Sequence, residues 1–172
     1  MILDLNLSVQ EILIKILLPL GIAFVVSALV GLERQNVGKA AGISSHILVA
    51  MGSTGIAIMQ RLMFEYHIYL QSTGIMIDPE GQRVIAQVIT GIGFVGAGVI
   101  LKDQKNVIKG ITTATTIWFT AMMGLILGSG YILIGSILGA FVIVFISVRD
   151  LSRGFNPFTN TARIRKPGAI EE

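Results

Sequence analysis

The sequence contains no cysteine, one tryptophan, two histidines and few charged residues. The lack of cysteine excludes disulfides, thiolate metal sites and cysteine nucleophiles, although it does not identify a cellular compartment. Charged residues make up 13% of the 172 positions, whereas an ordinary soluble domain has about 25%. Apolar residues reach 53%, and the mean hydropathy is +0.79. This composition predicts a membrane protein with one compact bundle and no second large domain.

Long apolar runs predict where the chain crosses the membrane. A hydrocarbon core of about 30 Å needs about 20 helical residues per crossing. By this measure we predict an all-α, polytopic transmembrane helical bundle of about five spans, of which the third and fourth are short. The predicted spans are Ile12–Leu32, Ile43–Met63, Val84–Leu101, Ile111–Leu127 and Tyr131–Val148. Residues 1–153 form the predicted transmembrane domain, and residues 154–172 form a polar cytoplasmic tail.

Proline residues indicate two local features. Pro19 is expected to kink the first span, because proline removes a backbone donor. The connection from Glu65 to Arg83 is the longest, and it is expected to be an outside loop. Asp78-Pro79-Glu80 near its end is typical of a helix start, with an N-cap, a proline in the first turn and an acid facing the helix dipole.

The distribution of lysine and arginine predicts the orientation. Basic residues gather in the first connection, the third connection and the tail, while the other side carries a cluster of acids: Asp4, Glu11, Glu65, Asp78 and Glu80. The positive-inside rule therefore puts the N-terminus outside and the C-terminus in the cytoplasm. The net charge of +3 is explained by anchoring to anionic lipid, and with no compact basic domain we expect no nucleic-acid partner.

A repeat relates the first and third connections. Leu32–Lys39 resembles Leu101–Lys109, and the segments that open the next helices, 42–45 and 110–113, also match. Both copies have one orientation, which predicts a tandem parallel repeat of helical hairpins. The acid–base order of Glu33-Arg34 is reversed in the corresponding Lys102-Asp103. We therefore expect two ion pairs where the turns meet at the cytoplasmic surface. The expected pairs are Glu33 with Lys102 and Arg34 with Asp103; Lys39 and Lys109 complete these charged turns. A coincidental match of short polar linkers is the alternative.

Glycine is concentrated in the third span. Its four glycines weaken an isolated helix, so either close packing or use of the exposed backbone must explain them. The four residues are Gly91, Gly93, Gly96 and Gly98. Their spacing formally matches a dinucleotide fingerprint, but the required strand and downstream acid are lacking. Two further stripes are expected to pack helices, one of them as a homodimer face: Gly124 with Gly128, and Gly135 with Gly139.

Polar residues near the third and fourth spans allow a structural and a functional interpretation. In the structural interpretation, Thr112 and Thr113 cap free backbone donors or bond to the preceding turn. In the functional interpretation, they line a small-ion site with the glycine carbonyls. In the functional interpretation Gln87 and Thr90 line the outer side of this site. His46 is a single imidazole and is expected to be a hydrogen-bonded helix residue rather than a metal ligand.

Glu33 has two interpretations as well. It is either an ion-pair partner of Arg34, Lys39 or Lys102, or a cation or proton site. The sequence contains no nucleophile–base–acid triad, phosphate loop or paired catalytic carboxylates. We therefore expect no enzymatic activity and name no cofactor.

Taken together, these motifs carry a family resemblance. They are Gly31-Leu32-Glu33-Arg34 with Gly38-Lys39 and Gly42, the approach 83–88 into the glycine run 91–98, and Gly110-Ile111-Thr112-Thr113-Ala114-Thr115-Thr116-Ile117-Trp118. From Gly31 to Gly130 the chain resembles the MgtC/SapB family of bacterial membrane proteins. The resemblance implies an inner-membrane protein associated with growth at low magnesium and with intracellular survival, without an established reaction.

This chain departs from the family pattern in two places. Ser44 stands where the family usually has a basic residue, so a cytoplasmic anchor is missing. The tail is also too short to be the soluble C-terminal domain of the longer members, so functions that depend on that domain are not transferred.

Two functions remain open after these observations. In the first, the protein is a non-enzymatic regulator in the lipid bilayer that binds itself or another membrane protein and affects magnesium homeostasis and stress or virulence adaptation. In the second, it is a transporter or channel for a small ion. The span interiors carry no acidic residue of the kind that cation carriers commonly use, which favours the first function.

Overall fold

The computed structural model describes residues 7–75, 82–102, 104 and 106–152. It is a bundle of helices with a small hairpin of two short strands, which confirms the predicted all-α class. The elements in chain order are α1 (Val9–Ile12), η2 (Leu13–Leu17), α2 (Leu18–Asn36), α3 (Ile43–Ser72), α4 (Gln82–Gly98), β1 (Leu101–Lys102), β2 (Ile108–Lys109), α5 (Ile111–Gly128) and α6 (Ile132–Ser152). Residues 78–80, 103 and 154–172, for which a helix start, an ion pair and a tail were predicted, lie outside the described residues.

Within the described residues, four helical stretches are long and apolar enough to cross a membrane, and they include the continuous helix Val9–Asn36 formed by α1, η2 and α2. The other three are α3, α5 and α6. The third predicted span corresponds to α4, which has 17 residues and ends before β1. At 1.5 Å per residue, α4 is about 25 Å long, somewhat less than the thickness of the hydrocarbon core.

The outside loop predicted from Glu65 was placed wrongly at its start. α3 continues as a helix to Ser72, well beyond the predicted end of the span at Met63. Helical hydrogen bonding does not stop at the membrane boundary, because a helix already formed adds residues at little further cost. The described part of this connection begins at Thr73.

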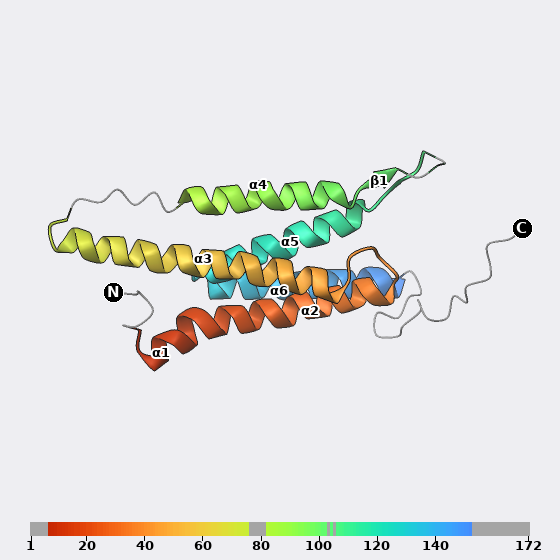
Figure 1. The fold of residues 1–172 in the computed structure, drawn as a ribbon. Coiled ribbons are helices and arrows are strands. Elements are labelled where there is room, and N and C mark those ends of the chain that lie inside the picture. The colour runs from red at the N-terminus through yellow and green to blue at the C-terminus, as the bar shows by residue number, and fades with distance from the viewer. Residues whose placement is uncertain (1–6, 76–81, 103, 105, 153–172) are drawn as a thin grey trace, which may run out of the picture.

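Successive helices run in opposite directions along the bundle (Figure 1). The α2–α3 connection, 37–42, and the β1–β2 hairpin lie at the same end, which we call the bend end. The turn Ser129–Gly130 between α5 and α6 lies at the opposite end, which we call the turn end. Two like-oriented hairpins are the arrangement that the parallel repeat requires, although the repeat itself stays a prediction.

The tight hairpin at the bend end requires a glycine. β1 and β2 pair antiparallel, with Leu101 opposite Lys109. Gly110 then starts α5 with a φ of +93°, and a side chain there would collide with the Val99 carbonyl. Only glycine adopts such a conformation readily, so Gly110 permits the hairpin to lead directly into α5.

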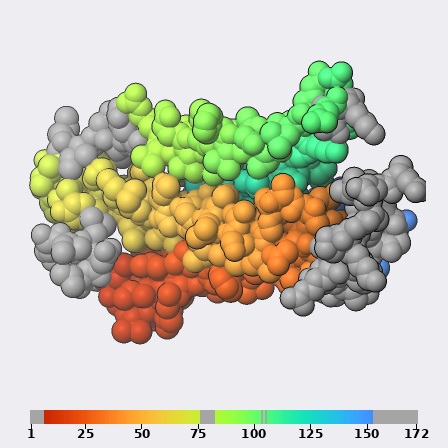
Figure 2. Space-filling model, turned by 45° about the vertical axis from the view of Figure 1, so that its right-hand side comes forward, coloured from red at the N-terminus to blue at the C-terminus, as the bar shows by residue number. Residues whose placement is uncertain are grey.

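The core is formed by α2, α5 and α6, and α3 packs against α2 and α5. The buried cluster contains Ala23, Val26, Val30, Met123, Leu127, Val142 and Ile146. α4 lies at the edge, against α5, and forms a ridge along one side of the molecule (Figure 2). Gly96 is the single fully buried residue of α4 among the side chains that the structure describes.

Glycines allow the inner helices to approach closely. A Cβ on Gly124 would lie 2.7 Å from the Ala50 carbonyl oxygen, and one on Gly128 would lie 2.7 Å from the Ala57 Cβ. A Cβ on Gly135 would lie 2.5 Å from the Leu127 side chain. Both predicted glycine stripes are therefore in contact with helices of the same chain, as membrane helices commonly use small residues.

Pro19 coincides with an irregular turn. The helix has π-type hydrogen bonding from Leu13 to Leu17, directly before the proline. A π-turn widens the helix locally and accommodates a missing backbone donor. The carbonyl of Lys15, four residues before Pro19, accepts a hydrogen bond from the Arg61 guanidinium on α3.

Candidate functional site

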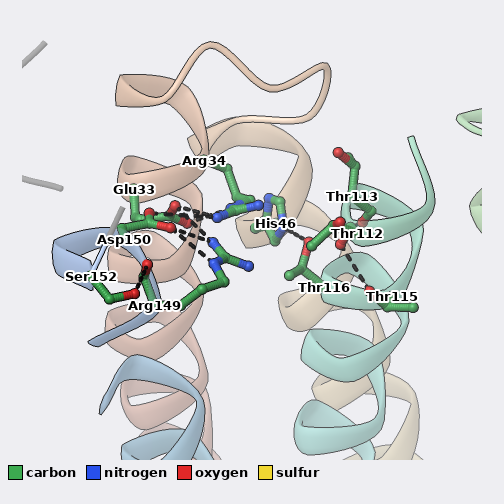
Figure 3. Close-up of polar contacts among 10 residues, drawn as sticks. All are labelled: Glu33, Arg34, His46, Thr112, Thr113, Thr115, Thr116, Arg149, Asp150 and Ser152. Atoms are coloured by element: carbon green, nitrogen blue, oxygen red, sulfur yellow. Dashed lines mark hydrogen bonds and ion pairs between the residues drawn. The ribbon is translucent and has the colours of Figure 1, made fainter. Parts of the chain in front are cut away.

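The most polar buried region lies at the bend end, where α2 and α6 finish side by side (Figure 3). The last turn of α2 contributes Glu33 and Arg34, and the last turn of α6 contributes Arg149 and Asp150. We call these four residues the charged quartet. Because each pair is local in sequence while the two pairs are far apart, the quartet forms only when α2 packs against α6.

Each acid of the charged quartet contacts both bases. Glu33 accepts hydrogen bonds from Arg34, and the Arg149 Nη2 lies 3.3 Å from its Oε1. Asp150 Oδ1 lies 2.8 Å from Arg149 Nη2, and Asp150 Oδ2 lies 3.8 Å from Arg34 Nη2. Two positive and two negative groups therefore balance within one cluster.

Burial makes this balance necessary. Arg34 has no exposed surface, and Asp150 and Glu33 are 2% and 5% exposed. Removing charges from water costs several kcal/mol per ion unless partners compensate. Two atoms of the charged quartet, Arg34 Nη1 and Asp150 Oδ2, are buried without a hydrogen-bond partner within the described structure.

The pairing predicted between the two turns is not the one described. Glu33 pairs with Arg34, one of its expected partners, and with Arg149, whereas Lys102 is exposed on β1. Arg34 pairs with Glu33 and Asp150. The proposed partner of Arg34, Asp103, lies outside the described residues. Lys39 and Lys109 are exposed at the bend end.

Sequence analysis missed Asp150 as a site residue and assigned Arg149 only to the basic tail. A signal was present, because an adjacent base and acid in an apolar helix resemble Glu33-Arg34 with the signs reversed. Charged residues in a membrane helix usually pair with one another, so the two dipeptides were natural partners.

His46 continues the polar region onto α3 and α5. The ring is fully buried, with Nδ1 2.8 Å from the Gly42 carbonyl oxygen and Nε2 3.2 Å from the Thr116 hydroxyl. A carbonyl can only accept, so Nδ1 donates. His46 is thus a hydrogen-bonded residue that joins the α2–α3 connection to α5.

The threonines at the start of α5 bond mainly within their own helix. Thr115 donates to the Thr112 carbonyl and Thr116 to the Thr113 carbonyl, each over 2.9 Å. The N-cap position is Gly110, which has no side-chain cap. The backbone carbonyls of Thr112 and Thr113 therefore accept hydrogen bonds from hydroxyls in the next turn of α5.

The remaining predicted site residues lie on α4. Gln87 and Thr90 are exposed, and the Thr90 hydroxyl bonds to the Ala86 carbonyl over 3.1 Å. A Cβ on Gly91, Gly93 or Gly98 would meet no atom within 4 Å. Gly96 alone approaches α5, with a built Cβ 3.7 Å from that of Ala114.

Two cavities among the described helices are mainly apolar. One of about 100 Å³ lies between α2 and α6 next to the charged quartet, and its lining includes Glu33 and Ser147. Another of about 380 Å³ lies between α2 and α3 and is lined by aliphatic and methionine side chains. Among the described residues, no group of three or more His, Cys, Asp or Glu is placed to hold a metal ion.

Comparison with known proteins gives a consistent result. Residues 20–153 match the model of the MgtC family. The chain is 40% identical over 116 residues to the Escherichia coli K12 protein named "Putative magnesium transporter YhiD", covering 67% of this chain and 52% of that protein. It is 41% identical over 116 residues to Protein SapB of Bacillus subtilis, covering 67% of this chain and 48% of SapB. It is 36% identical over 121 residues to Protein MgtC of Brucella abortus, covering 70% of this chain and 45% of that protein.

The chain spans about half the length of these curated relatives. No solved structure matches it.

Proposed function

Because this chain belongs to the MgtC family, we propose that it is a bacterial inner-membrane regulator of magnesium homeostasis that acts through contact with other membrane proteins and catalyses no reaction. Its N-terminus lies outside and its C-terminus in the cytoplasm, as the distribution of lysine and arginine favours. The name of the E. coli relative refers to magnesium transport. Regulation and transport are therefore the two functions that must be separated.

The observation that carries the regulatory function is the internal balance of the charged quartet. Its two acids are both paired with arginines, and arginine stays protonated at any physiological pH. A cation that bound Glu33 would have to displace Arg34 and Arg149 from a buried position. Such a cluster is suited to fixing α2 against α6 rather than to passing ions.

The middle of the bundle supports the same function. No Asp, Glu, Lys or Arg occurs in 18–32, 43–60, 84–101, 111–128 or 132–148. Buried hydroxyls there donate to carbonyls of their own helices, as Thr54 does to Ala50 over 2.7 Å and Ser27 to Phe24 over 3.1 Å. This is how hydroxyls are commonly accommodated inside membrane helices.

A small-ion transporter is the alternative function. The cavity beside Glu33 favours it, because an acidic side chain at a cavity in a membrane protein is a common cation ligand. In this alternative, Glu33 leaves both Arg34 and Arg149 during transport and binds the cation. The polar residues at the start of α5, Thr113 and Thr116, then continue the path.

Magnesium flux into liposomes tests the two functions directly. The full chain is reconstituted in vesicles that contain a magnesium-sensitive dye, beside empty vesicles and a Lys39→Ala control. The regulatory function predicts flux equal to that of empty vesicles. Flux that is lost in both Glu33→Gln and Thr113→Val but kept in Lys39→Ala would overturn it.

Growth at low magnesium tests the regulatory function in cells. We expect the full chain to restore growth of a strain that lacks its own family member, although the purified protein transports nothing. A chain that is inserted normally but neither transports magnesium nor changes growth or magnesium content would contradict both functions.

A further inference from the structure

The polar and apolar faces of α4 are oriented in an unexpected way. Its apolar stripe faces α5 and α3, and on it Ile85, Val88 and Ile92 are half-buried and Gly96 is buried. The polar residues Gln87 and Thr90 are exposed on the opposite side. In a bilayer, exposed surface faces lipid, where an amide side chain has no hydrogen-bond partner. A second protein surface over this face would supply such a partner.

The exposed face also has the spacing of a helix–helix contact. Gln87, Gly91, Phe94 and Gly98 are separated by four, three and four residues. Residues that alternate by three and four form the contact line of a left-handed helix pair, the common geometry in membrane bundles. Phe94 is 83% exposed, while Gly91 and Gly98 have open space around them. The face thus offers one large side chain between two recesses.

We propose that this face of α4 binds α4 of a second copy of the chain, which makes the protein a parallel homodimer. Two copies enter the membrane with the same orientation, so their α4 helices are parallel and each residue on the contact line meets its own counterpart. Gln87 suits this symmetry, because its amide both donates and accepts and can pair with an identical amide. The contact is compatible with either function proposed above.

The glycine stripes of α5 and α6 are already in contact with helices of the same chain, unlike the exposed face of α4. The space beside Gly124 and Gly128 is occupied by α3, and the space beside Gly135 and Gly139 is occupied by side chains of α5 and α2. They are consequently not available to a second copy. The homodimer face expected from the sequence is instead the face of α4 that is left exposed by the helices of the described part of the chain.

Single-cysteine cross-linking tests this arrangement, since the chain has no cysteine of its own. Cysteine is introduced at one position at a time, and native membranes are treated with a mild oxidant. We expect a band of twice the monomer mass for Gln87→Cys, Gly91→Cys, Phe94→Cys and Gly98→Cys. Ile85→Cys and Ile92→Cys, which lie on the half-buried face of α4, are matched controls and should stay monomeric. Equal cross-linking at both sets, or none at the first set, would overturn the proposal.

A second measurement does not depend on cysteine. The mass of the chain in lipid nanodiscs is followed as it is diluted with lipid, for the native chain and for Gln87→Leu. Because leucine keeps α4 apolar, insertion is retained, and we expect dissociation to become about threefold easier, the usual effect of one membrane hydrogen bond. A native chain that is monomeric at every dilution, or that cross-links only to a protein of another mass, would contradict a homodimer.

Discussion

Arg61 on α3 donates a hydrogen bond to the backbone carbonyl of Lys15, the carbonyl that Pro19 leaves without its usual helical donor. The side chain of Lys15 binds Glu65 at 2.7 Å, one turn of α3 beyond Arg61. The Gly130 turn lies against Arg61, and a Cβ there would approach its Nη1 to 2.8 Å. Arg61 thereby connects three parts of the turn end: the irregular turn before α2, α3, and the α5–α6 turn.

This relationship predicts a coupling between residues 19 and 61. Arg61→Met removes the donor from a part-buried carbonyl, and we expect a loss of about 1–3 kcal/mol in the free energy of unfolding. In a Pro19→Ala background the helix supplies its own donor to Lys15, so the same substitution should cost less. Denaturant titration of the four variants in mixed micelles measures the coupling. Equal costs in the two backgrounds would show that Arg61 does not compensate for Pro19.

The charged quartet predicts non-additive substitutions. Arg149→Leu leaves two buried acids with one arginine, and we expect a destabilisation of about 3–5 kcal/mol. Adding Glu33→Leu restores neutrality, because Arg34 and Asp150 remain as one pair, so the double variant should be more stable than Arg149→Leu alone. The exposed Lys39→Ala serves as a control and should change stability by less than about 0.5 kcal/mol. A double variant whose cost is the sum of the two single ones would refute this description of the quartet.

Glycines at two positions should respond in opposite ways to the same substitution. Gly124→Ala brings a methyl group within 2.7 Å of the Ala50 carbonyl oxygen, and we expect a loss of about 1–3 kcal/mol from overpacking. Gly93→Ala has open space and should leave stability unchanged or raise it by up to about 1 kcal/mol through helix propensity. Unfolding of the two variants in the same micelles provides the comparison. A destabilising Gly93→Ala would mean that α4 is packed against something on that side.

The contact between His46 and Thr116 predicts a difference between neighbouring threonines. Thr116→Val removes the hydroxyl next to Nε2 inside the bundle, and we expect a cost of about 1 kcal/mol. Thr115→Val removes a hydroxyl that is exposed and bonds only to its own helix, so its cost should be smaller. Hydrogen exchange of the connection 37–42 should also increase in Thr116→Val, because His46 holds the Gly42 carbonyl. Identical exchange in the two variants would argue against this link.

Hydropathy was sufficient to locate the helices, because the membrane requires long apolar segments with internally satisfied backbones. It failed at the end of α3, since Glu65, His67 and Gln71 interrupt the apolar pattern while the helix continues. The glycines of α5 and α6 were recognised as contact residues from spacing alone. Spacing could not show that a Cβ on most α4 glycines would meet no atom of the described residues within 4 Å, because that depends on which face α4 turns to α5.

The charged quartet shows a different limit of sequence reasoning. Glu33 and Arg34 were identified as important, but partners were sought in the similar turn at Lys102 rather than in α6. A matching pattern indicates common ancestry or geometry, whereas an ion pair depends on which helices are neighbours in space. The contact between α2 and α6 supplied that information.

The length of α3 has a consequence for the outer shape of the molecule. With 30 residues, it measures about 45 Å and exceeds the hydrocarbon thickness by about 15 Å. Because α3 packs along α5, it cannot tilt independently, and we expect its last turns to leave the hydrocarbon and enter the headgroup layer, since a bilayer with its headgroups is about 40–45 Å thick. Tyr66 and Tyr69 are 39% and 63% exposed on these turns, at a depth that aromatic rings favour. The turn end is therefore uneven, because α3 extends further there than the α5–α6 turn (Figure 1).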